Sequence, residues 1–124
     1  MVRKSFFKLF SIVCIVALLI TSTMAAAPGT NHGILVTVGG VQVGATVKVY
    51  RGPATNQEDY ANPVATLQAT TGQVTYLDQS GTAGTTYFYE ATQVVNGIES
   101  TVSPEASATY PTVPASPSIQ VAPQ

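Results

Sequence analysis

The sequence holds a single cysteine, no tryptophan and one histidine, and only 9% of its residues are charged. Because Cys14 lies inside an N-terminal hydrophobic segment that we expect to be removed, the mature chain has no thiol. This excludes disulfides, thiol catalysis and cysteine–metal sites from the mature protein. The domain must therefore be held together by its core, which a chain of about 100 residues can supply.

The first residues have the three parts of a secretory signal peptide. The segment opens with basic residues, continues as an apolar run over residues 9–20 that one serine interrupts, and closes with small residues. The run of about 12 residues is shorter than the roughly 20 that a membrane-spanning helix needs. We therefore predict a signal peptide over residues 1–26, cleaved after Ala25 or Ala26. The protein is then secreted, extracellular or periplasmic, with no membrane contact after cleavage, and an uncleaved N-terminal anchor is the alternative.

Removal of that segment changes the charge balance of the chain. The mature chain keeps two basic residues, Lys48 and Arg51, against six acidic ones, so its formal net charge is 2 − 6 = −4. A mildly acidic surface without a basic stripe repels phosphate backbones. We therefore expect no nucleic-acid partner.

Side chains that could carry catalysis are scarce in the mature chain. Its one histidine, His32, lies a few residues from the predicted new N-terminus, where side chains are usually mobile and solvated. It is therefore a poor candidate for the base of a hydrolytic site. The one dense acidic pair, Glu58 and Asp59, falls in a polar loop, where a weak calcium site is the alternative to the solvated loop that we prefer. We predict no enzyme activity, no cofactor and no metal site.

Short stretches rich in Val, Thr and Tyr, separated by Gly, Pro and Asn, fill residues 27–110 without helical periodicity. This pattern is typical of an all-β antiparallel sandwich. The dipeptide Asn96-Gly97 predicts a tight hairpin turn. Residues 111–124 are rich in proline and are predicted to form an extended tail or linker. The predicted strands cover residues 34–38, 46–51, 64–68, 73–78, 85–95 and 105–110.

A resemblance to the fibronectin type III domain is carried by residues 75–111, which read TYLDQSGTAGTTYFYEATQVVNGIESTVSPEASATYP. The segment has that family's short strand, Gly-Thr-x-Tyr corner, alternating strand, Gly-containing hairpin and closing Ala-Thr strand. Upstream, VKVYRG resembles the family's third strand, so the resemblance covers roughly residues 34–110. It implies an immunoglobulin-like (fibronectin type III-like) antiparallel β-sandwich of about seven strands. It also implies that Tyr87 is the corner tyrosine, whose hydroxyl bonds back to the chain just upstream.

Some features depart from that family's pattern. Val38 stands where a tryptophan is usual, Gln93 occupies a position that is normally small and apolar, and no first strand is apparent between residues 28 and 33. The stretch GGVQVGATVKVY also resembles the start of a prealbumin-like repeat, as in carboxypeptidase regulatory-like and collagen-adhesin B-type domains, which are sandwiches with another strand order. We prefer the fibronectin type III reading because it explains the C-terminal half, and the strand order stays open between the two.

Alternation along two predicted strands places four side chains on one outward face. Lys48 and Tyr50 lie on the strand at 46–51, and Phe88 and Glu90 lie on the strand at 85–95. In the fibronectin topology the two strands are antiparallel neighbours. A register with Lys48 opposite Glu90 also places Tyr50 opposite Phe88. The four residues either stabilise the sheet as cross-strand pairs or form a contact surface.

These expectations favour a secreted, non-catalytic binding or spacer module that contacts a protein or a polysaccharide. The alternative is a purely structural component of a cell surface or matrix with no specific ligand. Both families that the sequence resembles are interaction and spacer modules, and a fold by itself does not determine a function.

Overall fold

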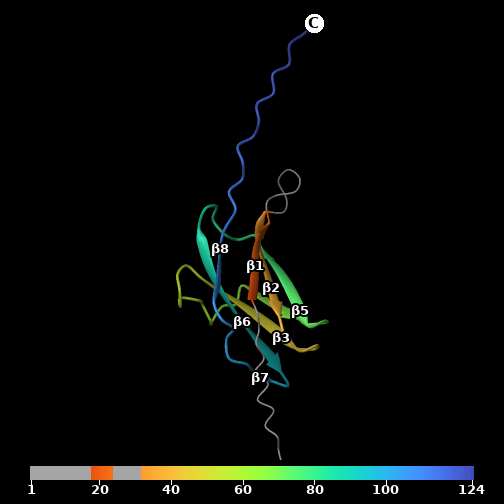
Figure 1. The fold of residues 1–124 in the computed structure, drawn as a ribbon, viewed down its shortest axis with the longest axis vertical. Coiled ribbons are helices and arrows are strands. Elements are labelled where there is room, and N and C mark those ends of the chain that lie inside the picture. The colour runs from red at the N-terminus through yellow and green to blue at the C-terminus, as the bar shows by residue number, and fades with distance from the viewer. Residues whose placement is uncertain (1–17, 24–31) are drawn as a thin grey trace, which may run out of the picture.

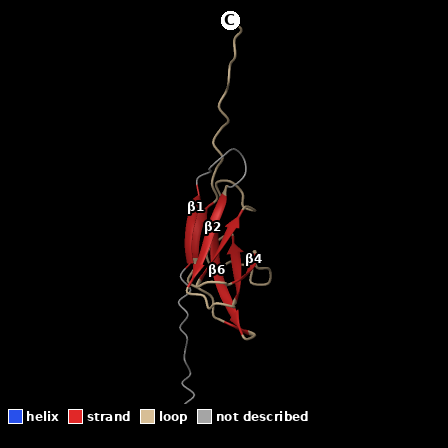
Figure 2. Cartoon of the chain, turned by 90° about the vertical axis from the view of Figure 1, so that its right-hand side faces the viewer, coloured by secondary structure: helices blue, strands red, loops and turns tan. Residues whose placement is uncertain are grey.

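The chain forms two antiparallel β-sheets packed face to face, which Figure 1 shows from the front and Figure 2 from the side. The computed structural model describes residues 18–23, as backbone, and residues 32–124. One sheet has the strand order β1-β2-β5, and the other has the order β4-β3-β6-β7 with β8 also paired to β6. The strands are β1 Leu18–Thr23, β2 Gly33–Gly39, β3 Thr46–Gly52, β4 Ala65–Gln68, β5 Gln73–Asp78, β6 Thr86–Val95, β7 Ile98–Glu99 and β8 Ala106–Thr109.

The six predicted strands are all present, with ends that move by one residue at most. The described residues form strands and no helix, so none offers a helix that could cross a membrane. Sequence analysis missed β7, which has only two residues and follows the tight turn at Asn96-Gly97. Both turn residues have positive φ, 50° and 77°, as the hairpin turn favoured by Asn-Gly requires.

The first strand of the sandwich comes from an unexpected part of the chain. β1 pairs antiparallel with β2 from Leu18 opposite Val38 to Thr23 opposite Gly33. Its residues belong to the segment 1–26 that we predict to be a signal peptide, the rest of which lies outside the described residues. The full chain therefore completes its three-stranded sheet with residues whose removal on export is predicted.

The core lies between the two sheets and is built by two-residue alternation. Ile34, Val36 and Val38 of β2 are at most 1% exposed, and they face Val47 and Val49 of β3, which are fully buried. Alternate residues of a strand point to opposite faces of its sheet, so one side of each strand can be wholly apolar. β6 contributes Tyr89 and Ala91 to the same cluster.

Residues 111–124 extend away from the sandwich as an irregular tail (Figure 1). Its apolar side chains contact water rather than the core: Ile119 and Val121 are 88% and 89% exposed. The sandwich that positions the candidate site ends at Tyr110, which is buried.

Candidate functional site

The outward face of β3 and β6 has a register that differs from the predicted one. Lys48 lies opposite Thr92, and Tyr50 lies opposite Glu90, while Phe88 lies opposite Gly52. The predicted pairs, Lys48 with Glu90 and Tyr50 with Phe88, were therefore wrong by two residues. A shift of two keeps every side chain on its side of the sheet, so the polar–apolar pattern of the sequence could not distinguish the two registers.

Lys48 and Tyr50 both bind a residue that sequence analysis did not single out, Glu99 of β7. The Lys48 Nζ lies 3.0 Å from the Glu99 carboxylate, and the Tyr50 hydroxyl donates to it over 2.8 Å. The Thr92 hydroxyl donates a third hydrogen bond over 2.6 Å. These donors, that of Thr92 first, lower the pKa of Glu99 to about 2. The only signal for this contact in the sequence is the Asn96-Gly97 turn, which brings Glu99 back beside β6.

Tyr50 and Glu90 are buried beneath the loop that joins β3 to β4. The Tyr60 ring of this loop packs on Tyr50 in an edge-to-face contact with centroids 5.2 Å apart, and its hydroxyl donates to the Glu90 carboxylate. That hydrogen bond is the main cause that raises the pKa of Tyr60 to about 12. Tyr50 and Glu90 are only 3% and 7% exposed, whereas Tyr60 is 51% exposed. Phe88 is half-buried, so Tyr60 is the more exposed aromatic residue of this region.

The same loop buries Glu58, where we preferred a solvated loop. Glu58 is 6% exposed, and neither of its carboxylate oxygens has a hydrogen-bond partner. The loop backbone packs so closely on β3 that a Cβ at Gly52 would lie 2.5 Å from the carbonyl of Gln57. Asp59, by contrast, is exposed and accepts hydrogen bonds from Ala61 and Asn62 within its own turn.

Burial, the largest cause, and the carboxyl groups of Glu105 and Glu90 raise the pKa of Glu58. Burial disfavours the charged form of a carboxyl group, and neighbouring negative charges act in the same direction. Glu105 itself accepts a hydrogen bond from the Asn56 backbone N–H over 2.8 Å. We name Glu58, Glu90 and Glu105 the glutamate cluster. Within residues 18–23 and 32–124, no group of three His, Cys, Asp or Glu side chains could hold a metal ion.

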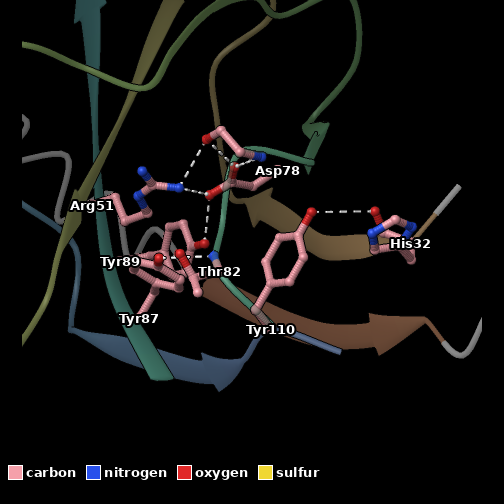
Figure 3. Close-up of polar contacts among 8 residues, drawn as sticks. His32, Arg51, Asp78, Thr82, Tyr87, Tyr89 and Tyr110 are labelled. Atoms are coloured by element: carbon pink, nitrogen blue, oxygen red, sulfur yellow. Dashed lines mark hydrogen bonds and ion pairs between the residues drawn. The ribbon is translucent and has the colours of Figure 1, made fainter. Parts of the chain in front are cut away.

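A second polar group, the Asp78 cluster, joins the two sheets near the same end of β3 (Figure 3). Asp78 of β5 is fully buried and accepts hydrogen bonds from Arg51 of β3 over 2.8 Å and from Tyr89 of β6 over 2.7 Å. Ser80 donates two more, from its backbone N–H and its hydroxyl. Burial by itself raises the pKa of Asp78, but these hydrogen bonds outweigh burial and leave it below its ordinary value. The Asp78 cluster is defined by Asp78, Arg51, Ser80 and Tyr89.

Tyr87 makes the contact that the fibronectin resemblance implies. Its hydroxyl accepts a hydrogen bond from the backbone N–H of Thr82, over 3.0 Å and five residues upstream (Figure 3). The Arg51 guanidinium lies 4.5 Å from the centroid of the Tyr87 ring, so the corner also supports the Asp78 cluster.

His32 is half-buried rather than solvated as we expected. Its ring meets that of Tyr110 edge to face, with centroids 5.9 Å apart (Figure 3). The Tyr110 hydroxyl donates a long hydrogen bond of 3.5 Å to the His32 carbonyl. His32 therefore closes one end of the sandwich.

The strand order and the packing of the sheets define an immunoglobulin-like β-sandwich. Comparison with solved structures narrows this class to a fibronectin type III-like fold. The chain is similar to a Fn3-like protein from Clostridium thermocellum with a TM-score of 0.53 and 23% identity, over 82% of this chain and 99% of that one. No family model and no curated protein matches the sequence. The fibronectin type III reading of the fold is thus confirmed over the prealbumin-like alternative.

Proposed function

We propose that this protein is exported and acts as a non-catalytic binding or spacer module that contacts a protein or a polysaccharide. The observation that carries the proposal is the exposed Tyr60 ring, held in place on the outward face of a rigid sheet by Tyr50 and Glu90. An aromatic side chain that is already ordered loses little entropy on binding, so it is suited to be a contact residue.

The four residues of the predicted contact surface have two roles in this proposal. Lys48 and Phe88 are half-buried and lie on the face that a partner would meet. Tyr50 and Glu90 are buried and support Tyr60 from below. The contact surface is therefore centred on Tyr60 of the loop rather than on Tyr50 of the strand.

The binding proposal is tested with one variant and one matched control. The exported protein is immobilised and probed with envelope proteins and with purified envelope polysaccharides. Tyr60→Ala should abolish retention of a specific partner. Ile98→Ala, which removes an apolar side chain that is 76% exposed on the β6–β7 hairpin, should leave retention unchanged. Equal retention by both variants would place the contact surface elsewhere.

The alternative function, a structural component without a specific ligand, is favoured by the tail. Residues 111–124 extend from the sandwich with proline at four positions, as a semi-rigid spacer does. This role predicts that no envelope component binds the immobilised protein at all, with or without Tyr60.

Export has a consequence for the fold. Cleavage after Ala25 or Ala26 would remove β1 and leave the edge of β2 without its partner. An open edge strand accepts another strand or loses protection of its amides. Mass spectrometry of the exported chain gives its first residue, and hydrogen exchange of the β2 amides gives the state of the edge. An exported chain that still contains residues 18–23 would show that the predicted cleavage is wrong.

A further inference from the structure

Cleavage of the signal peptide at the predicted position would open one edge of β2. The other edge of β2 is paired with β5, and β1 covers this one in the full chain. Proteins commonly protect a free edge strand with a charged residue, a proline or a bulge. β2 reads GILVTVG, without charge or proline, and its pairing with β5 is continuous. The edge that cleavage opens is therefore suited to accept another strand.

The tail, residues 111–124, has the alternation of a strand although it forms none in the structure. In its sequence PTVPASPSIQVAPQ every odd-numbered residue is apolar, and most even-numbered residues are polar. Ile119 and Val121 lie two residues apart and are 88% and 89% exposed. Residues 118–122 contain no proline, so all their backbone N–H groups can donate, and the tail contains no charge that pairing would bury. Such a segment can be added to the edge of a sheet.

The positions that β1 occupies beside β2 require apolar residues at this spacing. β1 sets Leu18 opposite Val38. Two residues further along, Ile20 stands opposite Val36. Val36 and Val38 belong to the core, and residues directly opposite each other in an antiparallel pair share one face of the sheet. A strand that replaces β1 therefore needs two apolar residues two positions apart, as the tail has.

The direction in which the tail leaves the sandwich distinguishes its own β2 from that of a second copy. Tyr110 lies beside His32 at the end where β2 begins, and Figure 1 shows the tail running outward from that end. An antiparallel partner of β2 enters at the other end, at Gly39, as β1 does. Within one molecule, residues 111–117 would have to run back along all of β2. Seven extended residues span about 23 Å, the length of β2 itself, so none would remain for the reversal of direction.

We propose that, after export, the tail of one copy replaces β1 on the β2 edge of the next copy, with residues 118–122 as the added strand. A tail that points outward from one copy enters the next at its Gly39 end and runs in the direction of β1, and residues 111–117 link the two. This head-to-tail contact does not close on itself, so it produces linear chains of copies. The inference rests on the export step of the proposed function and is independent of Tyr60.

Two other arrangements would also cover the edge. The β2 edges of two copies could pair with each other, which gives a symmetric dimer that does not need the tail. The tail could instead lie parallel to β2 of its own molecule, which gives a monomer. The size of the assembly and its dependence on Ile119 distinguish both arrangements from the linear chain.

The experiment measures the mass of the exported protein by size-exclusion chromatography with light scattering, after mass spectrometry has given its first residue. The cleaved chain should form oligomers whose size rises with concentration. Ile119→Asp would bury a charge in the added strand and should leave a monomer, and the sandwich should stay folded because Ile119 lies outside it. Val113→Asp, the same kind of change in the linker, and Tyr60→Ala should both retain the oligomers.

The outcomes separate this inference from the proposed function. A cleaved chain that is monomeric, that forms a dimer of fixed size, or that keeps its oligomers in Ile119→Asp would overturn the inference and leave the export proposal intact. An exported chain that still contains residues 18–23 would overturn the predicted cleavage and the inference together. Loss of partner binding in Tyr60→Ala with unchanged oligomers would support both proposals.

A second measurement uses a peptide of residues 111–124 and needs no variant of the chain. Added in excess, the peptide should occupy the β2 edges and reduce the oligomers of the exported chain to monomers. The β2 amides should then stay protected from hydrogen exchange, because the peptide pairs with them. The same peptide with Ile119→Asp should leave the oligomers unchanged. Oligomers that persist in excess unaltered peptide would contradict strand replacement.

Discussion

Two of the buried carboxylates, those of Asp78 and Glu58, have opposite surroundings. Asp78 is fully buried and receives hydrogen bonds from Arg51, Tyr89 and Ser80, so its pKa stays below the ordinary value. Glu58 is almost as deeply buried, receives none, and has a raised pKa. Burial raises the pKa of both groups, and hydrogen-bond donors or an opposite charge beside the ionised carboxylate reverse that effect. The Asp78 cluster is therefore a structural element of the sandwich, whereas the glutamate cluster contains a buried carboxyl group without hydrogen-bond donors.

The largest effect is expected where the satisfied carboxylate is removed. Asp78→Ala should lower the free energy of unfolding by about 3 kcal/mol, because it leaves the Arg51 guanidinium and the Tyr89 hydroxyl without their acceptor. Urea denaturation followed by tyrosine fluorescence measures this change. Asp59→Ala is the control on an exposed carboxylate and should cost well under that amount. Equal losses in both variants would contradict the distinction between the two kinds of site.

A smaller loss is expected when Asp78 keeps its charge but loses one donor. Tyr89→Phe removes a buried hydroxyl that donates to Asp78 over 2.7 Å and should cost about 2 kcal/mol, since hydrogen bonds to charged groups are stronger than neutral ones. Tyr60→Phe removes a hydroxyl from the exposed side of the glutamate cluster and should cost less. If Tyr60→Phe loses more free energy of unfolding than Tyr89→Phe in urea denaturation, the distinction between the two clusters is wrong.

The opposite sign is expected at Glu58. At neutral pH, Glu58→Gln should raise the free energy of unfolding by about 1 kcal/mol, because a neutral amide replaces a buried charge without donors and can itself donate to Glu105. A loss of stability in this variant, measured by urea denaturation, would show that the Glu58 charge is compensated by some other group.

The smallest effect is the pH dependence of stability, to which Glu58 and Asp78 contribute in opposite directions. The pKa of Glu58 in the folded state lies above its ordinary 4.5, so lowering the pH from neutral toward 4.5 protonates the folded state first and raises stability. The folded-state pKa of Asp78 lies below 3.8, so the stability that it contributes is present above 3.8 and is lost as the pH falls below that value. Denaturation across this range should therefore show a maximum on the acidic side of neutral. The rise on its neutral side should disappear in Glu58→Gln, and its persistence there would assign it to another group.

The strands that form the core could be predicted from the sequence. The strands predicted at residues 34–38 and 46–51 are present, and their residues Ile34, Val36, Val47 and Val49 lie in the core. The corner at Tyr87 was predicted from the resemblance to the fibronectin type III domain, and the residues that make it are close in sequence. The contacts of the outward residues could not be predicted, because a register shift of two residues leaves the alternation pattern unchanged. The partners of these residues also lie in a loop and a hairpin.

The β3–β4 loop and β1 show why the other features could not be predicted from the sequence. The loop over residues 53–64 is polar in composition, which favours a solvated segment, yet its close packing on Gly52 buries Glu58 and places Tyr60 over Tyr50. β1 comes from a segment whose basic, apolar and small-residue pattern indicates a signal peptide. A hydrophobic segment can serve as a signal peptide or as an edge strand, so its composition does not distinguish the two roles.

The sequence by itself determined an all-β sandwich, because two-residue alternation and turn residues act locally. Only the tertiary structure decided which buried carboxylates receive hydrogen bonds. Asp78 and Glu58 have the same chemistry along the chain, and what separates them is whether segments distant in sequence bring donors or further carboxylates to the same place. Charge compensation depends on distances of a few ångströms across the fold, and no local pattern in a sequence records those.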